Sequence, residues 1–156
     1  MSENFRRMIQ LAEDFFATKQ DPEQLDVTPQ VMEALEALHP ATLSEETEGD
    51  GPVVWLLLIP TTDEVMESFL SGKLSEHQLL QETKRGSSFS ALYLCSALVL
   101  PEYRNQGRAF RTAIKAISTI AADHPIRILF TWNFSEEGAR LAQRISEHTG
   151  LPLRVR

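Results

Sequence analysis

The junction between an apolar stretch and a long amphipathic pattern most constrains what this chain can fold into. Residues 92–100 are mostly apolar and are followed at once by a short polar turn over residues 101–107. From about Gly107 to Ala122, apolar residues recur at helical spacing. A strand that runs directly into a helix is the repeating unit of layered α/β domains. We therefore expect a sheet covered by helices.

The remaining elements follow from hydrophobic periodicity and from residues that start or stop helices. Helices are predicted over residues 2–19, 28–39, 61–70, 75–83 and 135–150, with capping boxes at residues 61–64 and 75–78. Strands are predicted over residues 53–59, 92–100 and 126–134, with a closing edge strand over 151–156. The acidic segment 44–52 holds two glycines and is predicted to be a loop.

Together these elements predict an α/β (α+β) fold, a layered mixed sheet flanked by helices. Residues 1–156 are expected to form one domain, since this length suits a single hydrophobic core. Residues 1–45 would be its helical N-terminal portion and residues 53–156 its core. Helices over 61–83 would lie between two consecutive strands.

Composition and charge exclude several classes of function. The net charge of −7 argues against a general nucleic-acid binder, which needs a basic surface. No apolar run approaches a membrane span, and the N-terminus lacks a signal-peptide pattern, so a cytoplasmic protein that binds no membrane is expected. Cys95 is the single cysteine, which leaves no CxxC pair, and we expect it to be a buried structural thiol. His39, His77, His124 and His148 show no metal-ligand spacing, so no metal is expected and each should lie in a loop or on the surface.

The polar turn has the chemistry of an anion-binding site. Gly107 has no Cβ and Ala109 a small one, so a diphosphate could approach the backbone closely. A helix start also presents unpaired N–H groups and the positive end of the helix dipole. Arg108, Arg111 and Lys115 follow at positions i, i+3 and i+7 and would share one helix face. That stripe is either a solvated basic face or a phosphate-binding surface.

The turn, the basic helix and the order of elements resemble the acyl-CoA pyrophosphate loop of the GNAT acetyltransferase superfamily. Arg104, Gly107 and Ala109 fit the pattern [Gln/Arg]-x-x-Gly-x-[Gly/Ala] at a strand-to-helix junction. The resemblance covers residues 53–156 and is specific over about 93–120. It implies that the strand before the turn separates from its neighbour, and that the pantetheine arm of acetyl-CoA or another acyl-CoA lies in the gap. The cofactor-binding residues it implies are Leu98, Val99, Leu100, Arg104, Asn105, Gln106, Gly107, Arg108, Ala109 and Asn133.

The resemblance also implies transfer of the acyl group to an amine, either a small molecule or a peptide. It implies a general base on the strand before the turn, where Tyr93 is the nearest candidate, since no carboxylate or histidine occurs between Ser87 and Leu100. It further implies a tyrosine four residues before Gly150, where this chain has Ser146, with His148 nearby. The acidic residues 45–50 would be either a solvated loop or a lip that attracts a cationic amine.

Two other functions stay open. The missing base and tyrosine fit a non-catalytic CoA-binding or regulatory module on the same fold. A plain α/β interaction domain, with a purely structural glycine turn, is the third interpretation. The helices over residues 61–83 could form a lid over the acceptor or fill its site. The C-terminal edge strand could pair with a second copy to give a homodimer.

Overall fold

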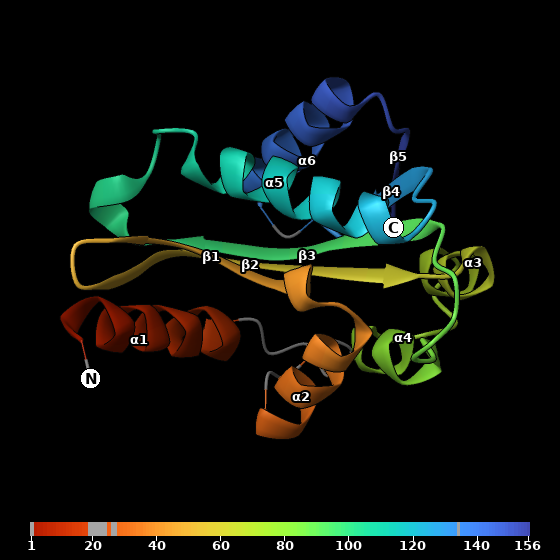
Figure 1. Ribbon diagram of the computed structural model, residues 1–156, viewed down its shortest axis with the longest axis horizontal. Coiled ribbons are helices and arrows are strands. Elements are labelled where there is room, and N and C mark those ends of the chain that lie inside the picture. Colours follow the sequence, from red (N-terminus) through yellow and green to blue (C-terminus); the bar gives the residue numbers. More distant parts are fainter. Residues whose placement is uncertain (1, 19–24, 26–27, 134) are drawn as a thin grey trace.

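A five-stranded mixed sheet separates two layers of helices in the computed structural model, which describes residues 2–18, 25, 28–133 and 135–156. The strands are β1 (Leu43–Glu48), β2 (Gly51–Thr61), β3 (Ala91–Val99), β4 (Ile128–Thr131) and β5 (Leu153–Val155). The helices are α1 (Glu3–Thr18), α2 (Pro29–Leu38), α3 (Asp63–Leu70), α4 (Glu76–Glu82), α5 (Arg108–Asp123) and α6 (Glu136–Thr149). Two short 3₁₀ turns are η1 (Pro40–Thr42) and η2 (Pro101–Tyr103). Figure 1 shows α5 and α6 on one face of the sheet and α1, α2 and α4 on the other, with α3 near one end.

The strands lie in the order β1-β2-β3-β4-β5, which is also their order along the chain. β1, β2 and β3 pair antiparallel, whereas β3, β4 and β5 pair parallel. Parallel neighbours need a crossover connection, and α5 and α6 supply the two crossovers on the same face. The predicted mixed α/β layering is confirmed, as is the helix pair α3–α4 between β2 and β3.

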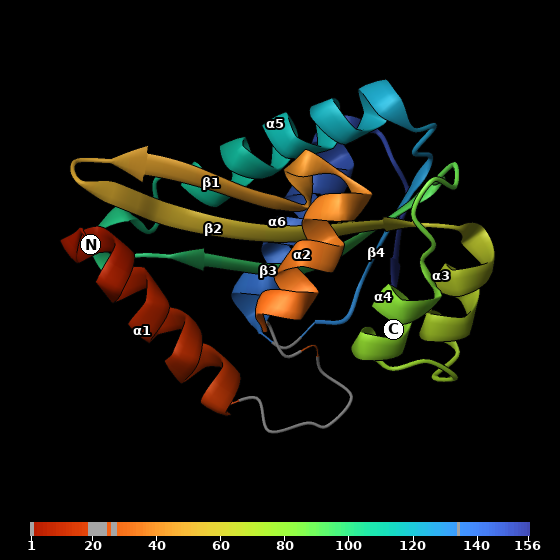
Figure 2. The ribbon, with the colours of Figure 1, turned by 60° about the horizontal axis from the view of Figure 1, so that its bottom comes forward.

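The alternation of side chains along the strands builds a core on each face of the sheet. Leu92 and Tyr93 are consecutive and fully buried, yet they belong to different apolar clusters because neighbouring side chains of a strand point to opposite faces. Leu92 packs with Ile117 of α5, and Tyr93 packs with Phe69 of α3. A third cluster joins α1 to β2 and the end of β3, around Met8. Figure 2 shows α1, α2 and α4 on the side of the sheet opposite to α5.

The prediction of a loop over residues 44–52 is wrong. β1 occupies Leu43–Glu48 and pairs with β2 from Leu43↔Leu57 to Glu48↔Gly51, with Gly49 at φ +67° in the turn. Pairing with the long strand β2 satisfies the backbone hydrogen bonds of this polar segment. Its sequence lacks the hydrophobic alternation that would predict a strand. Charged side chains suit an edge strand because they discourage further strand pairing.

The helix ends mostly follow the predicted caps. Ser75 and Gln78 form the expected capping box, with bonds of 2.9 and 3.1 Å between each side chain and the other residue's backbone N–H. The capping box at residues 61–64 is wrong, because Thr62 caps α3 alone and Val65 stands where the acidic partner would be. The strand predicted over 126–134 is shorter, since β4 ends at Thr131. The outer ends of two predictions, Lys19 and Phe134, lie outside the described residues.

Candidate functional site

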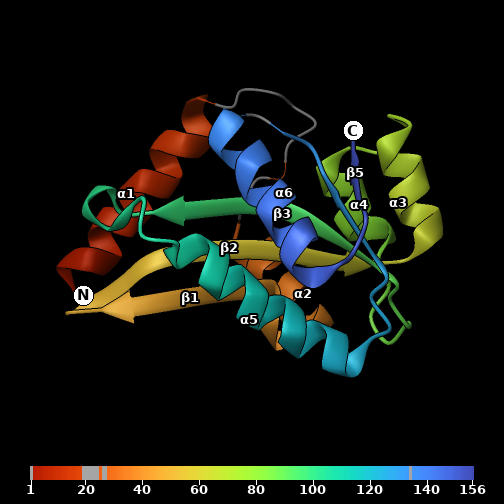
Figure 3. The same cartoon turned by 90° about the horizontal axis from the view of Figure 1, so that it is seen from above.

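β3 separates from β4 halfway along its length. The two strands pair from Ala91↔Ile128 to Leu94↔Thr131, and the Thr131 hydroxyl donates to the Leu94 carbonyl at 3.1 Å. β3 continues to Val99, whereas β4 has ended, so within the described part of the chain no strand pairs with this edge over residues 96–99. Figure 3 shows β3 running on beyond β4 toward α1. An open strand edge can pair with an extended ligand through its backbone groups.

The polar turn follows this edge and ends at the N-terminus of α5. Gly107 caps the helix with φ +72°, a left-handed conformation that favours glycine. A Cβ at this position would lie 3.2 Å from the Arg111 guanidinium, which itself donates to the Gln106 carbonyl at 2.7 Å. Gly107 offers no side chain as a cap, so the first N–H groups of α5 depend on another partner. Asn105 also has a positive φ, +62°.

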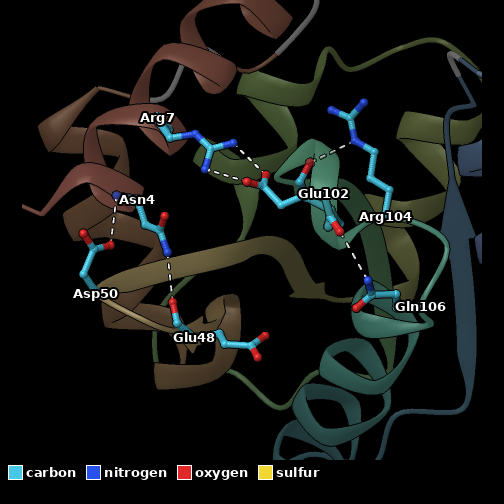
Figure 4. A network of polar contacts seen from close by, with 8 residues as sticks. Asn4, Arg7, Glu48, Asp50, Glu102, Arg104 and Gln106 are labelled. Carbon is cyan, nitrogen blue, oxygen red and sulfur yellow. Dashed lines mark hydrogen bonds and ion pairs between the residues drawn. The ribbon is translucent and has the colours of Figure 1, made fainter.

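A network of polar contacts holds the turn against α1 (Figure 4). Arg7 of α1 binds both carboxylate oxygens of Glu102 at 2.6 and 2.9 Å, and this pairing lowers the pKa of Glu102. Gln106 donates to the Glu102 carbonyl at 3.2 Å, and Arg104 donates to the Val99 carbonyl at 3.0 Å. The turn is therefore tied both to α1 and to the end of β3, so its conformation is set in advance of any ligand.

The structure divides the predicted basic stripe. Arg108 turns toward β1, where it pairs with Glu48 and lies 3.4 Å from a Glu46 carboxylate oxygen, and its guanidinium lies 4.8 Å from the centre of the Tyr103 ring. Only 16% of its side chain is exposed. The acidic segment predicted as a solvated loop or an amine-attracting lip thus directs two carboxylates at this arginine.

Arg111 and Lys115 instead line an open groove of about 490 Å³ on the outer side of α5. The groove residues are Phe110, Arg111, Ile114, Lys115, Ser118, Thr119 and His148. The Arg144 guanidinium from α6 lies 4.5 Å from the centre of the Phe110 ring. An apolar floor with cations at its rim fits an anionic ligand that also carries an apolar or aromatic part.

The three candidate catalytic residues do not come together. Ser146 donates its hydroxyl to the Leu151 carbonyl at 2.6 Å, a contact that closes the C-terminal end of α6. His148 lies on the outer groove, with its ring 5.4 Å from that of Phe110. Tyr93 is fully buried on the opposite face of the sheet. The predicted cofactor residues Leu98 and Leu100 bury their side chains against α1. Both backbone groups of Leu100 are already bonded, its N–H to the Val53 carbonyl and its carbonyl to the Tyr103 N–H. Asn133 is exposed just beyond β4.

A buried carboxylate that sequence reasoning missed lies directly against Tyr93. Glu76, the first residue of α4, is 4% exposed, and one of its oxygens accepts the Tyr93 hydroxyl. The same oxygen lies 3.7 Å from the Cys95 sulfur, and the other accepts the Leu25 N–H at 2.8 Å. Burial first, and then the neighbouring Cys95 and Glu76, raise the pKa of the Tyr93 phenol. We expected a buried thiol at Cys95, whereas the structure shows it half-buried and in contact with this carboxylate.

Glu76 could have been found from helical spacing alone. Leu79 and Leu80 follow it at i+3 and i+4, and all three side chains are buried on one face of α4. Its position at the start of a helix hid this signal, because an acidic residue in the first turn is usually exposed and interacts with the helix dipole.

His39 lies in the short connection between α2 and η1, within the prediction of a loop or surface histidine, but its side chain is buried, with 5% exposed. Its Nδ1 accepts the Ala41 N–H at 3.0 Å, so Nε2 carries the proton and donates to Asp123 at 2.6 Å.

Comparison of the chain with protein-family models, with curated proteins and with solved structures gives no match. Within the described ranges, no three histidine, cysteine or acidic side chains gather as a metal site. No helix in the same residues has the length and apolar character needed to cross a membrane.

Proposed function

We propose that this protein binds acyl-CoA and transfers the acyl group, acetyl or similar, to an amine. The observation that carries the proposal is the separation of β3 from β4 immediately before the Gly107 turn. An open strand edge and a helix start without a side-chain cap are thereby joined by a single polar turn, as the resemblance to GNAT acetyltransferases leads us to expect.

The described residues can account for each part of such a ligand. The backbone of residues 96–99 would pair with the amide groups of the pantetheine arm. The N–H groups of residues 106–109 would bind the diphosphate at the positive end of α5. Arg111 and Lys115 would add charge at the groove, whose apolar floor could take the nucleoside.

The reaction itself needs little from the protein beyond positioning. The amine nitrogen attacks the thioester carbonyl, a C–N bond forms, the C–S bond breaks, and the departing thiolate becomes protonated. Holding the two substrates together supplies much of the rate, and strand N–H groups can stabilise the developing oxyanion. The remaining requirement is a group that accepts the proton of the amine.

A thermal-shift titration with acetyl-CoA, CoA and desulfo-CoA tests the binding step. Ligand at about 100 times its dissociation constant adds about 2.7 kcal/mol of stability, which gives a clear rise in Tm. Arg111→Glu should reduce that rise because it reverses a charge in the groove, whereas Arg85→Glu, at an exposed site between α4 and β3, should not. A wild-type protein whose Tm responds to none of the three compounds would contradict the proposal.

A non-catalytic CoA-binding module is the second candidate, and the placement of Ser146 and His148 favours it. The Ser146 hydroxyl is engaged by the Leu151 carbonyl, and His148 faces the outer groove, so neither is directed at the gap between β3 and β4. An acyl-transfer assay across a panel of small amines and peptides separates the two candidates. Turnover well above the rate without protein would exclude the non-catalytic module.

A further inference from the structure

Glu76 is the one Asp, Glu, Lys or Arg side chain that is buried among the described residues, and the proposed cofactor contacts do not involve it. It lies in the cluster formed by Leu57, Phe69, Leu79 and Phe130 around Tyr93. Removing a carboxylate from water costs several kcal/mol unless other groups compensate.

The contacts of Glu76 show that its carboxylate is an acceptor. The Leu25 N–H, the Tyr93 O–H and the Cys95 S–H all point donors toward it. Both carboxylate oxygens are therefore engaged as acceptors, one by the backbone and the other by two side chains. The raised pKa of Tyr93 keeps the phenol protonated and therefore a donor.

The cluster lies beneath the point where the sheet opens. Tyr93 is opposite Phe130 in the β3–β4 pairing, and Leu94 is the last paired residue of β3. Cys95 is the next residue and is half-buried, whereas Tyr93 and Glu76 are almost fully buried. The thiol that contacts Glu76 therefore belongs to the first β3 residue beyond the stretch paired with β4.

The carboxylates on the other side of the gap are already committed to partners. Glu48 pairs with Arg108, Asp50 accepts the first N–H groups of α1, and Glu102 binds Arg7. Each of these would have to lose an attractive contact before accepting a proton. Glu76, by contrast, contacts Cys95, the first β3 residue beyond the stretch paired with β4.

We infer that Glu76, from the helix pair between β2 and β3, takes up the proton that the acceptor amine loses, an inference that rests on the proposed function. The ammonium group of the acceptor docks beside Cys95 and gives one proton to the Glu76 oxygen that faces Cys95 and Tyr93, and the neutral nitrogen attacks the thioester carbonyl. The C–S bond then breaks, the CoA thiolate takes the second proton from the nitrogen, and Glu76 releases the first proton to water. The products are the amide, CoA thiol and one proton, and the protein returns to its starting state.

The experiment begins with acetyl-CoA binding to each variant and continues with kcat for an alkylamine acceptor. Glu76→Gln should lower kcat by about 100-fold or more, the usual contribution of a proton acceptor, with the dissociation constant for acetyl-CoA unchanged within about twofold. Glu76→Asp should be faster than Glu76→Gln but slower than the wild type, because it keeps the carboxylate on a side chain that is one methylene shorter. Glu82→Gln, an exposed change of the same kind on the same helix, should match the wild type.

An aromatic amine that is neutral at the assay pH provides a readout that a purely structural role would not change. The loss caused by Glu76→Gln should be smaller for this acceptor than for an alkylammonium acceptor, since the latter must lose one more proton before attack. If Glu76→Gln does not fold, the losses for the two acceptors are compared in Glu76→Asp instead.

Retention of kcat within about threefold in Glu76→Gln, or equal losses for both acceptors, would overturn the inference alone. A protein that binds acetyl-CoA but acylates no amine would overturn it as well. A wild-type protein that does not bind acetyl-CoA would overturn the proposed function, and this inference with it.

Discussion

At the scale of single residues, His39 connects the end of α2 to α5 through two hydrogen bonds. Its Nδ1 accepts the Ala41 N–H, and its Nε2 donates to Asp123 at the last turn of α5. His39→Ala leaves the buried Ala41 N–H without its partner, so the free energy of unfolding should fall by about 1–3 kcal/mol in urea denaturation. Asp123→Asn should cost less, because the Asp123 side chain is 63% exposed. A His39→Ala protein within about 0.5 kcal/mol of the wild type would contradict this role.

Tyr93 should make the protein unstable in alkali. Burial raises the pKa of its phenol, so the folded protein holds the proton at a pH where the unfolded chain releases it. Stability from this source is complete below the ordinary tyrosine pKa of about 10 and falls as the pH rises above it. Urea denaturation between pH 8 and 11 should show that fall in the wild type and a smaller one in Tyr93→Phe. Identical pH dependence in the two proteins would contradict the burial argument.

Glu76 shows why this part of the site was missed at the residue scale. Its local sequence, Ser75-Glu76-His77-Gln78, describes an ordinary exposed helix start, and that start is what the backbone forms. Its burial depends on Tyr93, seventeen positions later in the chain, and on Leu25, which precedes it by fifty-one. Contacts across such separations leave no local pattern, although the burial of one face of α4 could have been predicted.

At the scale of elements, β1 competes with any phosphate for Arg108. Glu46 and Glu48 hold the guanidinium in the apoprotein, so a bound anion gains less from it than from Arg111. Glu46→Gln/Glu48→Gln should bind CoA more tightly by up to about fivefold, the equivalent of one exposed ion pair of about 1 kcal/mol. Glu33→Gln/Glu36→Gln, on the exposed side of α2, removes the same charge and controls for the general effect of net charge. Isothermal titration calorimetry measures the CoA affinity of both double variants. Equal affinities would exclude competition between β1 and a phosphate for Arg108.

The cap of α4 should affect both stability and the buried carboxylate. Ser75 and Gln78 close the helix start next to Glu76 with two hydrogen bonds. Ser75→Ala should lower the free energy of unfolding by about 1 kcal/mol, as loss of an N-cap usually does. Chemical denaturation checks this, with Ser71→Ala, at the exposed end of α3, as the comparison. A change below about 0.3 kcal/mol would show that packing alone fixes α4.

Hydrophobic periodicity predicted the elements whose own sequence has regular apolar spacing, and it failed for β1, whose sequence has none. α5 and the adjoining strand β3 have regular apolar spacing, and both were predicted within one or two residues. β1 has a single apolar residue, Leu43, among its six, and it is a strand only because β2 extends far enough to pair with it. The position of Arg108 follows from that pairing, so it was beyond local sequence reasoning too.

At the scale of the whole molecule, the sheet is intact at one end and open at the other. All five strands pair in order, yet β4 stops at Thr131 while β3 runs on to Val99, so the opening lies between two helix layers (Figures 1 and 3). The groove and the N-terminus of α5 belong to one layer, and Glu76 belongs to the other. We therefore expect acyl-CoA and the amine to approach the gap from opposite faces of the sheet. The residue types at the turn suggested the proposed cofactor side, whereas the proposed acceptor side follows only from the packing of α4.

Hydrogen–deuterium exchange with and without acetyl-CoA tests the central claim most directly, because it locates the bound ligand on the backbone. The account predicts that acetyl-CoA slows exchange over residues 95–110, the open edge of β3 and the start of α5, and leaves α2 and β1 little changed. Protection confined to other segments, or none at a saturating concentration, would contradict an acyl-CoA site at this opening.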